Sequence, residues 1–208
     1  MVFFFLFFAI ITIGSDDMYS LFIDTHDLDL VIALYKDKQL KDKEIKESLR
    51  NHSDYTMPII DEIIKRNNIG IHDIKEILVV NGPGSFTGVR IGVTIAKMLA
   101  YTLNIPIKSM DSITMYGISD NDKNKKLVLI PDVKGSYGGV FENNTLIGEL
   151  FYKSKAELEE YIKENNINKI VENKIDFNKI IEYFESVEPT LAHLVNPIYV
   201  KVIEALKW

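Results

Sequence analysis

A glycine-rich run, NGPGSFTGVRIG at residues 81–92, constrains what this chain can fold into more than any other feature. It lies between a short apolar stretch typical of a buried strand and a segment that can form a long helix, from about Phe86 to Leu103. Very small residues recur there at every fourth position, namely Gly84, Gly88, Gly92, Ala96 and Ala100. Because residues four apart share a helix face, the sequence predicts a helix that another backbone approaches closely.

Three glycine-rich enzyme motifs share part of this run, and none of them fits it. A phosphate-binding loop of the Walker type needs a second glycine followed by lysine, but Thr87 and Val89 occupy the positions where that glycine would stand. The dinucleotide fingerprint fails because its third glycine is displaced to Gly88. A nucleophile elbow needs one residue between glycine and serine, whereas Ser85 directly follows Gly84.

The remaining positions of the helix are also apolar, so more than one of its faces must be covered. One face packs within the same domain. A second face packs either within that domain as well or against another subunit, and we expect another subunit. Arg90, the only charged residue between Asn81 and Ala96, then binds a carboxylate or carbonyl at the rim, an exposed arginine being the alternative. Gly88→Leu should abolish the contact and leave the monomer folded. The predicted contact residues are Gly84, Phe86, Gly88, Val89, Arg90, Gly92, Val93, Ala96 and Ala100.

The order of predicted elements repeats along the chain. Three strands joined by tight turns precede a helix, a strand, a long helix, a second strand and a short helix. After a polar linker at residues 120–126, three strands, a helix, a short strand and a helix follow. This order predicts a mixed α/β fold with a duplicated pattern, an N-terminal lobe at residues 18–119 and a smaller C-terminal lobe at residues 120–208. The predicted strands and helices are 19–24, 29–35, 39–45, 51–67, 76–80, 86–103, 105–108, 111–116, 127–132, 138–142, 145–152, 155–165, 169–171 and 177–185.

Residues 1–17 differ from the rest, because they contain the twelve-residue apolar run VFFFLFFAIITI. Twelve residues are too few for a membrane-spanning helix, which needs about 20. We expect this leader to lie outside the fold, which then begins at Met18; a weak membrane anchor and an ordinary extra element are the alternatives. The absence of cysteine agrees with a cytoplasmic location, and the net charge of -6 argues against a broad phosphate-binding surface.

Four segments carry a resemblance to the bacterial TsaB family: Phe22–Thr25, Asn51–Ser53, Gly82–Gly92 and Asn104–Pro106. It extends from Met18 to about Tyr116 and is weaker at Ile130–Asp132 and Asn196–Tyr199. The resemblance implies a two-lobed actin, Hsp70 and sugar-kinase type of fold, which is a duplicated ribonuclease-H-like fold with mixed sheets. It also implies a role in making N6-threonylcarbamoyladenosine in tRNA, as a non-catalytic partner of the related transferase TsaD, with the ATPase TsaE joining them.

The same resemblance implies that the glycine-rich helix packs on TsaD, or on its own copy when TsaD is absent, and that tRNA is reached only through the complex. The catalytic relative holds a metal with two histidines, whose positions we align with Asp111 and Met115. Methionine is a poor ligand for such a metal, so no metal site and no catalytic residue are predicted. No membrane partner is expected unless the leader is retained.

Asp24, Thr25 and Asp132 stand where actin-like proteins bind nucleotide and magnesium, so they form a vestigial nucleotide site at most. The turn after Asp24 is acidic and would repel phosphate. No resident cofactor is therefore predicted. Binding of ATP or ADP at the boundary between subunits is an alternative that the sequence leaves open. The alternative function is a stand-alone metal- and ATP-dependent hydrolase or kinase that uses Asp24 and Asp132.

Overall fold

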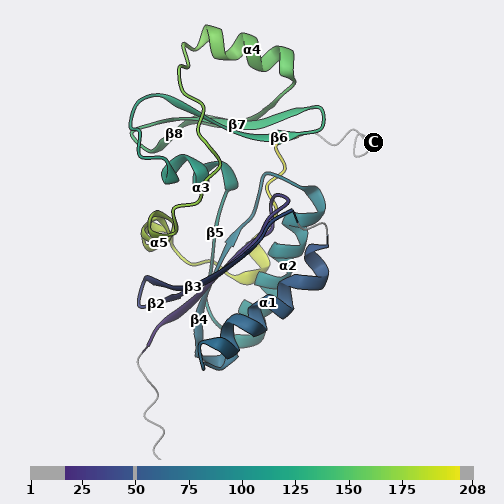
Figure 1. The fold of residues 1–208 in the computed structure, drawn as a ribbon, viewed down its shortest axis with the longest axis vertical. Coiled ribbons are helices and arrows are strands. Elements are labelled where there is room, and N and C mark those ends of the chain that lie inside the picture. Colours follow the sequence, from purple (N-terminus) through teal and green to yellow (C-terminus); the bar gives the residue numbers. More distant parts are fainter. Residues whose placement is uncertain (1–16, 49–50, 202–208) are drawn as a thin grey trace, which may run out of the picture.

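The structure is a computed structural model that describes residues 17–48 and 51–201. Its larger sheet has the strand order β3-β2-β1-β4-β5 (Figure 1). The first three strands form an antiparallel meander, and β4 and β5 run parallel to β1. This is the mixed, ribonuclease-H-like arrangement that the sequence predicts. The strands are β1 (Tyr19–Asp24), β2 (Leu30–Lys36), β3 (Gln39–Lys46), β4 (Ile74–Val80) and β5 (Ile107–Met110).

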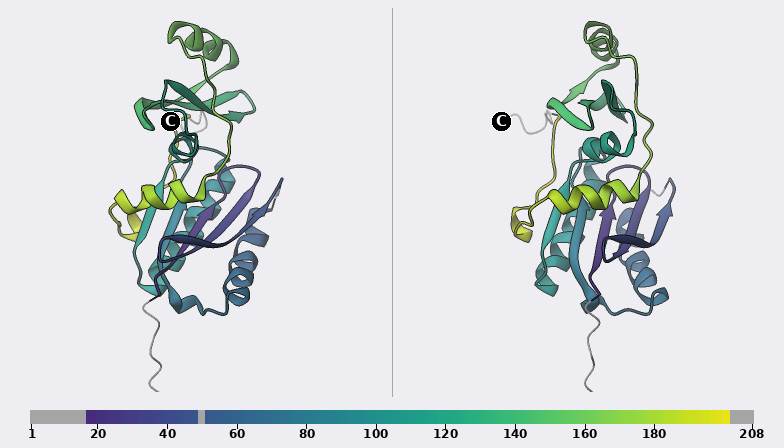
Figure 2. Two further views of the ribbon diagram at one scale, coloured as in Figure 1. Left: turned by 60° about the vertical axis from the view of Figure 1, so that its left-hand side comes forward. Right: turned by 90° about the vertical axis from the view of Figure 1, so that its left-hand side faces the viewer.

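The larger sheet is covered by helices on both faces because its central strands are apolar on both sides. Leu21 and Ile23 of β1 face one apolar cluster, whereas Phe22 between them faces the other. The first cluster includes residues of α1 (His52–Arg66) and α2 (Phe86–Leu103). The second includes residues of α3 (Ser112–Ser119) and α5 (Phe177–Ser186), which lie across the sheet (Figure 2). The sheet is thus the middle layer of three.

Pro58 lies inside α1, where the sequence predicts a break or a kink, yet α1 is recorded as one helix from His52 to Arg66. Proline lacks the N–H that would bond the carbonyl of Asp54. Both residues are exposed, so water can satisfy that carbonyl. Burial of Ile60 and Ile63 against the sheet holds the helix in place across the lost bond.

A second, antiparallel sheet consists of β6 (Lys126–Asp132), β7 (Gly135–Glu142) and β8 (Thr145–Lys153). The turn at Asn143 and Asn144 has both residues in the left-handed region, as the predicted hairpin requires. β7 begins at Gly135, three residues before the predicted strand at 138–142, and the turn before it consists of Val133 and Lys134. α4 (Lys155–Glu164) lies on the outer side of this sheet (Figure 1).

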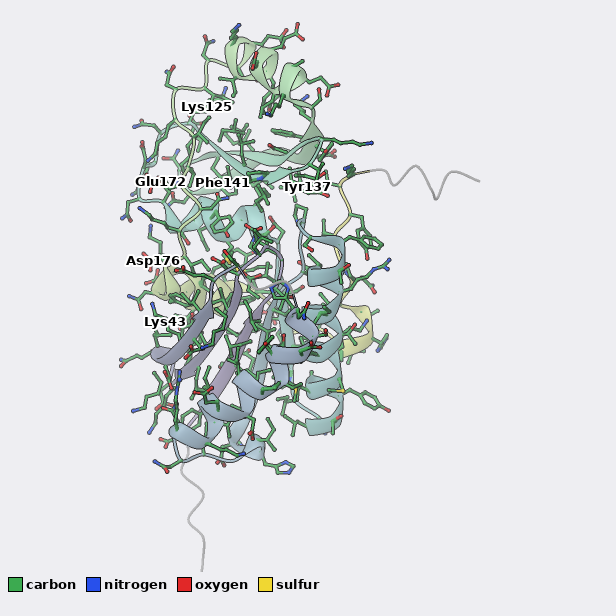
Figure 3. The ribbon with its side chains drawn as sticks, turned by 45° about the vertical axis from the view of Figure 1, so that its right-hand side comes forward. Lys43, Lys125, Tyr137, Phe141, Glu172 and Asp176 are labelled. Carbon is green, nitrogen blue, oxygen red and sulfur yellow. The ribbon has the colours of Figure 1, made fainter. Side chains whose placement is uncertain are left out.

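Phe141 of β7 connects the two sheets, because it is fully buried in the cluster that also contains α3 and α5 (Figure 3). A Cβ atom at Gly117 of α3 would lie 2.5 Å from its ring. The small residue therefore lets the second sheet pack closely on α3.

The chain returns to the larger sheet after the second one. The Tyr35 hydroxyl donates to the carbonyl of Phe177 at 2.9 Å, and the Thr190 N–H donates to the carbonyl of Ile107 at 2.9 Å. Much of the segment predicted as the C-terminal lobe thus completes the core of the N-terminal one. The predicted strand at residues 169–171 is only an isolated bridge, between Ile170 and Leu127. A domain boundary after residue 119 stays a prediction.

The apolar leader lies outside the described residues, apart from Asp17, whose carboxylate pairs with Lys36 Nζ at 2.8 Å. Across residues 17–48 and 51–201, no helix has the length and apolar character needed to cross a membrane.

Candidate functional site

α2 starts where the sequence supplies a cap. The Ser85 hydroxyl accepts the N–H of Gly88 at 3.2 Å, and Asn104 adopts a left-handed conformation that ends the helix. Gly84 therefore precedes the helix and is not part of it. The backbone N–H of the next residue, Ser85, donates to the carbonyl of His26 at 2.7 Å. This bond holds the loop before α2 against the turn after β1.

The small-residue face of α2 packs inside the chain. Added Cβ atoms at Gly84 and Gly88 would lie 2.2 Å from the carbonyl oxygens of His26 and Thr25, and one at Gly92 would lie 2.3 Å from Thr25 Oγ1. That hydroxyl donates to the carbonyl of Gly88 at 2.7 Å. The close approach predicted from the sequence exists, but the other backbone is the end of β1.

This packing corrects the predicted contact residues. Phe86 and Arg90 are exposed and Gly84 is half-buried. The other six are buried in the isolated chain and are not available to a partner: Gly88, Val89, Gly92, Val93, Ala96 and Ala100. Gly88→Leu would consequently strain the monomer itself, contrary to the expectation from the sequence, because its side chain would have to displace the backbone of Thr25.

The opposite face of α2 is apolar and exposed. It carries Phe86, Met98 and Tyr101, the last with 83% of its surface exposed. A shallow hollow of about 530 Å³ lies between this face and α1; it is lined by Ser53, Met57, Phe86, Thr87, Arg90, Ile91, Thr94 and Ile95. We call this hollow the α1–α2 groove. Sequence reasoning missed most of its residues, although the apolar character of every face of α2 was a signal for it.

Arg90 lines the groove and has no carboxylate partner within residues 17–48 and 51–201. Its guanidinium carbon lies 3.7 Å from the centre of the Phe86 ring, and its Nε donates to the Tyr199 hydroxyl at 2.7 Å. Stacking on an aromatic ring and a neutral acceptor thus replace the carboxylate or carbonyl that the sequence predicts.

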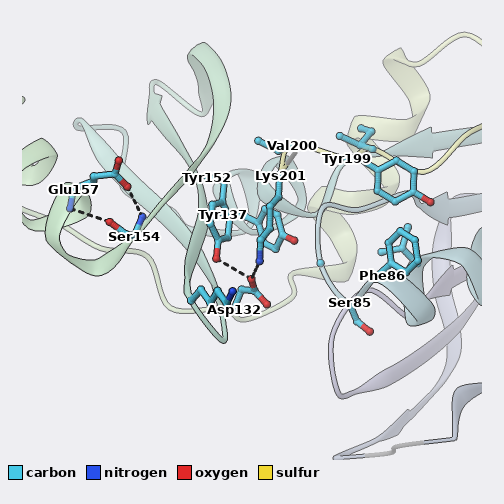
Figure 4. A pocket seen from close by; sticks show the side chains of 14 residues that line it. Ser85, Phe86, Asp132, Tyr137, Tyr152, Ser154, Glu157, Tyr199, Val200 and Lys201 are labelled. Carbon is cyan, nitrogen blue, oxygen red and sulfur yellow. Dashed lines mark hydrogen bonds and ion pairs between the residues drawn. The ribbon is translucent and has the colours of Figure 1, made fainter. Parts of the chain in front are cut away.

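Asp132 lines a larger cavity of about 740 Å³ between the second sheet and the start of α2 (Figure 4). Its carboxylate accepts from the Tyr152 hydroxyl at 2.9 Å and pairs with Lys201 Nζ at 2.7 Å. Partial burial alone would raise the pKa of Asp132, but Lys201 and Tyr152 lower it below its usual value. The carboxylate is therefore charged and already paired with the chain's own cation.

Asp24 lies elsewhere, in a smaller cavity beside the turn after β1. Its Oδ1 is 2.7 Å from Nδ1 of His26, and both side chains are 2% exposed. Asp24 and Asp132 line different cavities, so the structure does not bring together the two acids that a stand-alone hydrolase or kinase would use. Among the described residues, no group of three or more histidine or acidic side chains is placed to hold a metal ion.

Comparison with known proteins matches residues 46–134 to the family model described as TsaD: tRNA N6-adenosine threonylcarbamoyltransferase. TsaB of Bacillus subtilis is 41% identical over 96 residues, which cover 46% of this chain and 42% of that protein. TsaB of Haemophilus influenzae is 33% identical over 84 residues, or 40% of this chain and 35% of its own length. Over these segments the chain is similar to the TsaB family.

The fold agrees with this similarity. A Pseudomonas aeruginosa crystal structure, described as similar to peptidase YeaZ, superposes with a TM-score of 0.72 and covers 88% of this chain and 100% of that one. Identity to it is 15%, so it shows the fold alone. The aligned part of this chain spans about half or less of the first curated relatives: 42%, 52% and 35% of their lengths.

A tRNA N6-adenosine threonylcarbamoyltransferase of Clostridioides difficile is 39% identical over 64 residues, which are 31% of this chain and 19% of that protein. The match to the transferase model, at residues 46–134, includes both helices of the α1–α2 groove. The part of this chain that is similar to the transferase family thus carries this groove.

Proposed function

We propose that the chain is a non-catalytic subunit that binds a TsaD transferase and supports threonylcarbamoyl transfer to adenosine in tRNA, in the cytoplasm. The observation that carries this proposal is the exposed apolar α1–α2 groove on a helix pair that matches the transferase model. A soluble protein seldom leaves large apolar side chains such as Phe86, Met98 and Tyr101 uncovered along one face of a helix without a partner.

The partner that fits is the transferase, because its α1–α2 region is similar in sequence and can offer a matching helix pair. Two such pairs can pack face to face in a four-helix arrangement. In the absence of the transferase, a second copy of this chain offers the same surface, so we expect a homodimer that the transferase displaces. TsaE and tRNA then join through the complex rather than through this chain alone.

Adenine nucleotide is part of the same proposal. The isolated chain has no free carboxylate at either position to hold the magnesium of a nucleotide triphosphate, since Asp24 pairs with His26 and Asp132 pairs with Lys201. We therefore expect ATP or ADP to bind at the boundary of the complex, and isothermal titration of the isolated chain with ATP and magnesium should show no binding at millimolar concentration.

The proposal is tested with Thr94→Arg, which places a long charged side chain in the centre of the groove. Thr94 is exposed, so the variant should fold normally. Size-exclusion chromatography with light scattering on the chain mixed with its cognate TsaD should show the complex weakened at least about tenfold, because the cation must be desolvated at the contact.

Thr145→Arg, the same change on an exposed residue at the start of β8, is the matched control and should leave the complex unchanged. Equal binding of wild type and Thr94→Arg would show that the groove is not the contact surface. Failure of wild-type chain and transferase to associate at all would contradict the proposed function itself.

A further inference from the structure

The turn between β1 and β2 contains a buried pair of side chains that the proposed function does not use. Oδ1 of Asp24 accepts hydrogen bonds from the ring Nδ1 and the backbone N–H of His26, at 2.7 and 3.0 Å. Both bonds fix the imidazole with its Nδ1–H directed at the carboxylate. In the neutral ring the lone pair is then on Nε2, which is an acceptor.

That acceptor has no partner. Nε2 of His26 is buried and forms no hydrogen bond with the described part of the chain. The Tyr116 ring packs edge to face against the His26 ring, with centroids 5.5 Å apart. Buried polar atoms are nearly always paired, because an unpaired one loses its bonds to water without replacement. The orphaned nitrogen is therefore an observation that points to a ligand.

His26 lines a cavity of about 430 Å³, which we call the turn cavity. Its walls come from the turn after β1, from β3, from Tyr116 of α3 and from residues 173–177. Asp27, Asp29 and Glu47 also line it, and no ion pair in residues 17–48 and 51–201 engages any of these three carboxylates.

The two lysines in the walls offset only part of this charge. Lys43 Nζ lies 4.4 Å from the centre of the Phe177 ring and keeps one positive charge against the three carboxylates, whereas Lys174 pairs with Glu172. The turn cavity thus combines excess negative charge, an apolar wall and one buried acceptor.

We infer that the turn cavity binds a small organic primary amine, whose ammonium donates a hydrogen bond to Nε2 of His26 and whose charge lies among Asp27, Asp29 and Glu47. A metal ion fits less well, since the cluster does not supply three ligands at one point. An anion would be repelled by the carboxylates. This inference does not depend on the contact with a transferase.

Protonation of His26 must oppose this binding. Burial alone would lower the pKa of His26, but the charge and hydrogen bond of Asp24, together with Asp27 and Asp29, raise it above its usual value. Tyr116, Lys43, Glu47 and Lys174 are the other titratable groups around the cavity. An imidazolium donates from both nitrogens and repels an ammonium, so the amine should bind at least about tenfold more weakly once His26 is protonated.

The experiment uses the full chain with ¹⁵N-labelled histidine, titrated with 1,4-diaminobutane and followed by NMR of the His26 ring. Amine binding should shift the Nε2 resonance and lower the His26 pKa, and the affinity should fall as the pH is lowered. Butane-1,4-diol lacks the charge, and the hexamethylated diamine lacks the N–H; each should bind at least about tenfold more weakly.

Glu47→Gln removes one exposed carboxylate of the cavity and should weaken diamine binding about two- to fivefold. Glu149→Gln, the same exposed change on β8, should leave binding unchanged. An unaltered His26 pKa at saturating diamine overturns the inference. So does binding of the hexamethylated diamine as tight as that of the diamine, or an equal loss in the two variants.

Discussion

Gly88 shows how a single missing Cβ atom sets the packing of α2. Alanine is favoured over glycine in helices by about 1 kcal/mol, so Gly88→Ala would stabilise an isolated helix. In this chain the added Cβ would lie 2.2 Å from the carbonyl oxygen of Thr25, which is backbone and cannot rotate away. The clash outweighs the propensity, and we expect a net loss of about 2–4 kcal/mol in the free energy of unfolding, measured by urea denaturation.

Gly70→Ala is the control at the same scale. A Cβ at Gly70 has its nearest neighbour at 3.5 Å, which is ordinary contact, and its φ of -96° is open to alanine. The free energy of unfolding of the Gly70→Ala variant should equal that of wild type or exceed it by up to about 1 kcal/mol. A Gly88→Ala protein as stable as Gly70→Ala would show that α2 does not pack on β1 through this face.

Between elements, Lys126 holds the linker of residues 120–125 to the turn between β7 and β8. Its fully buried Nζ donates to the carbonyls of Asp120 and Asp122 at 2.9 and 2.6 Å and to Asn144 Oδ1 at 2.9 Å. Burial lowers the pKa of Lys126, although Asp120 opposes this. Lys126→Met leaves these oxygens without their donor, so we expect a loss of about 2–4 kcal/mol in urea denaturation.

Lys125→Met tests whether the loss of stability in Lys126→Met is due to the buried hydrogen bonds of the Lys126 ammonium. Lys125 is the neighbouring residue (Figure 3), and its Nζ donates only to the carbonyl of Asn165, at 2.7 Å, from a half-exposed position. Its loss should cost no more than about 1 kcal/mol. Similar losses in both variants would mean that Lys126 contributes only its charge.

At the scale of the whole molecule, residues 196–201 connect the two sheets. Ile198 N–H donates to the carbonyl of Asn81 at 2.8 Å, whereas Lys201 pairs with Asp132 of the second sheet. Asp132→Asn should raise hydrogen exchange at Ile198 several-fold, with less than about 1 kcal/mol lost globally, because the pair is partly exposed and screened by solvent. Unchanged exchange would contradict this connection.

The sign of the pH dependence follows from the lowered pKa of Asp132. The pair's contribution is fully present above the ordinary pKa of aspartate, about 3.9, and is lost as the pH falls through the lower pKa of the folded protein. Wild type should therefore approach Asp132→Asn only below about pH 4. Glu172→Gln, which breaks an exposed pair with Lys174, should leave the exchange at Ile198 unchanged.

Local sequence patterns determined most of the elements of this fold. Alternation and turn residues located the meander, and four-residue spacing located α2 and its close-packing face. These signals are local, because a residue's neighbours along the chain decide its hydrogen bonds within a helix or a turn. The mixed order of strands followed from them, and the TsaB resemblance agreed with it.

Tertiary structure alone decided which surface each face of α2 meets. The spacing of Gly84, Gly88 and Gly92 shows that some backbone comes close, but not whether that backbone belongs to this chain. Likewise, Asp24 and Asp132 end corresponding strands, yet each carboxylate is taken up by its own neighbour, His26 or Lys201. His26 is only two residues from Asp24, but Lys201 is 69 residues from Asp132, so that pairing depends on how the sheets and helices pack, which no local pattern encodes.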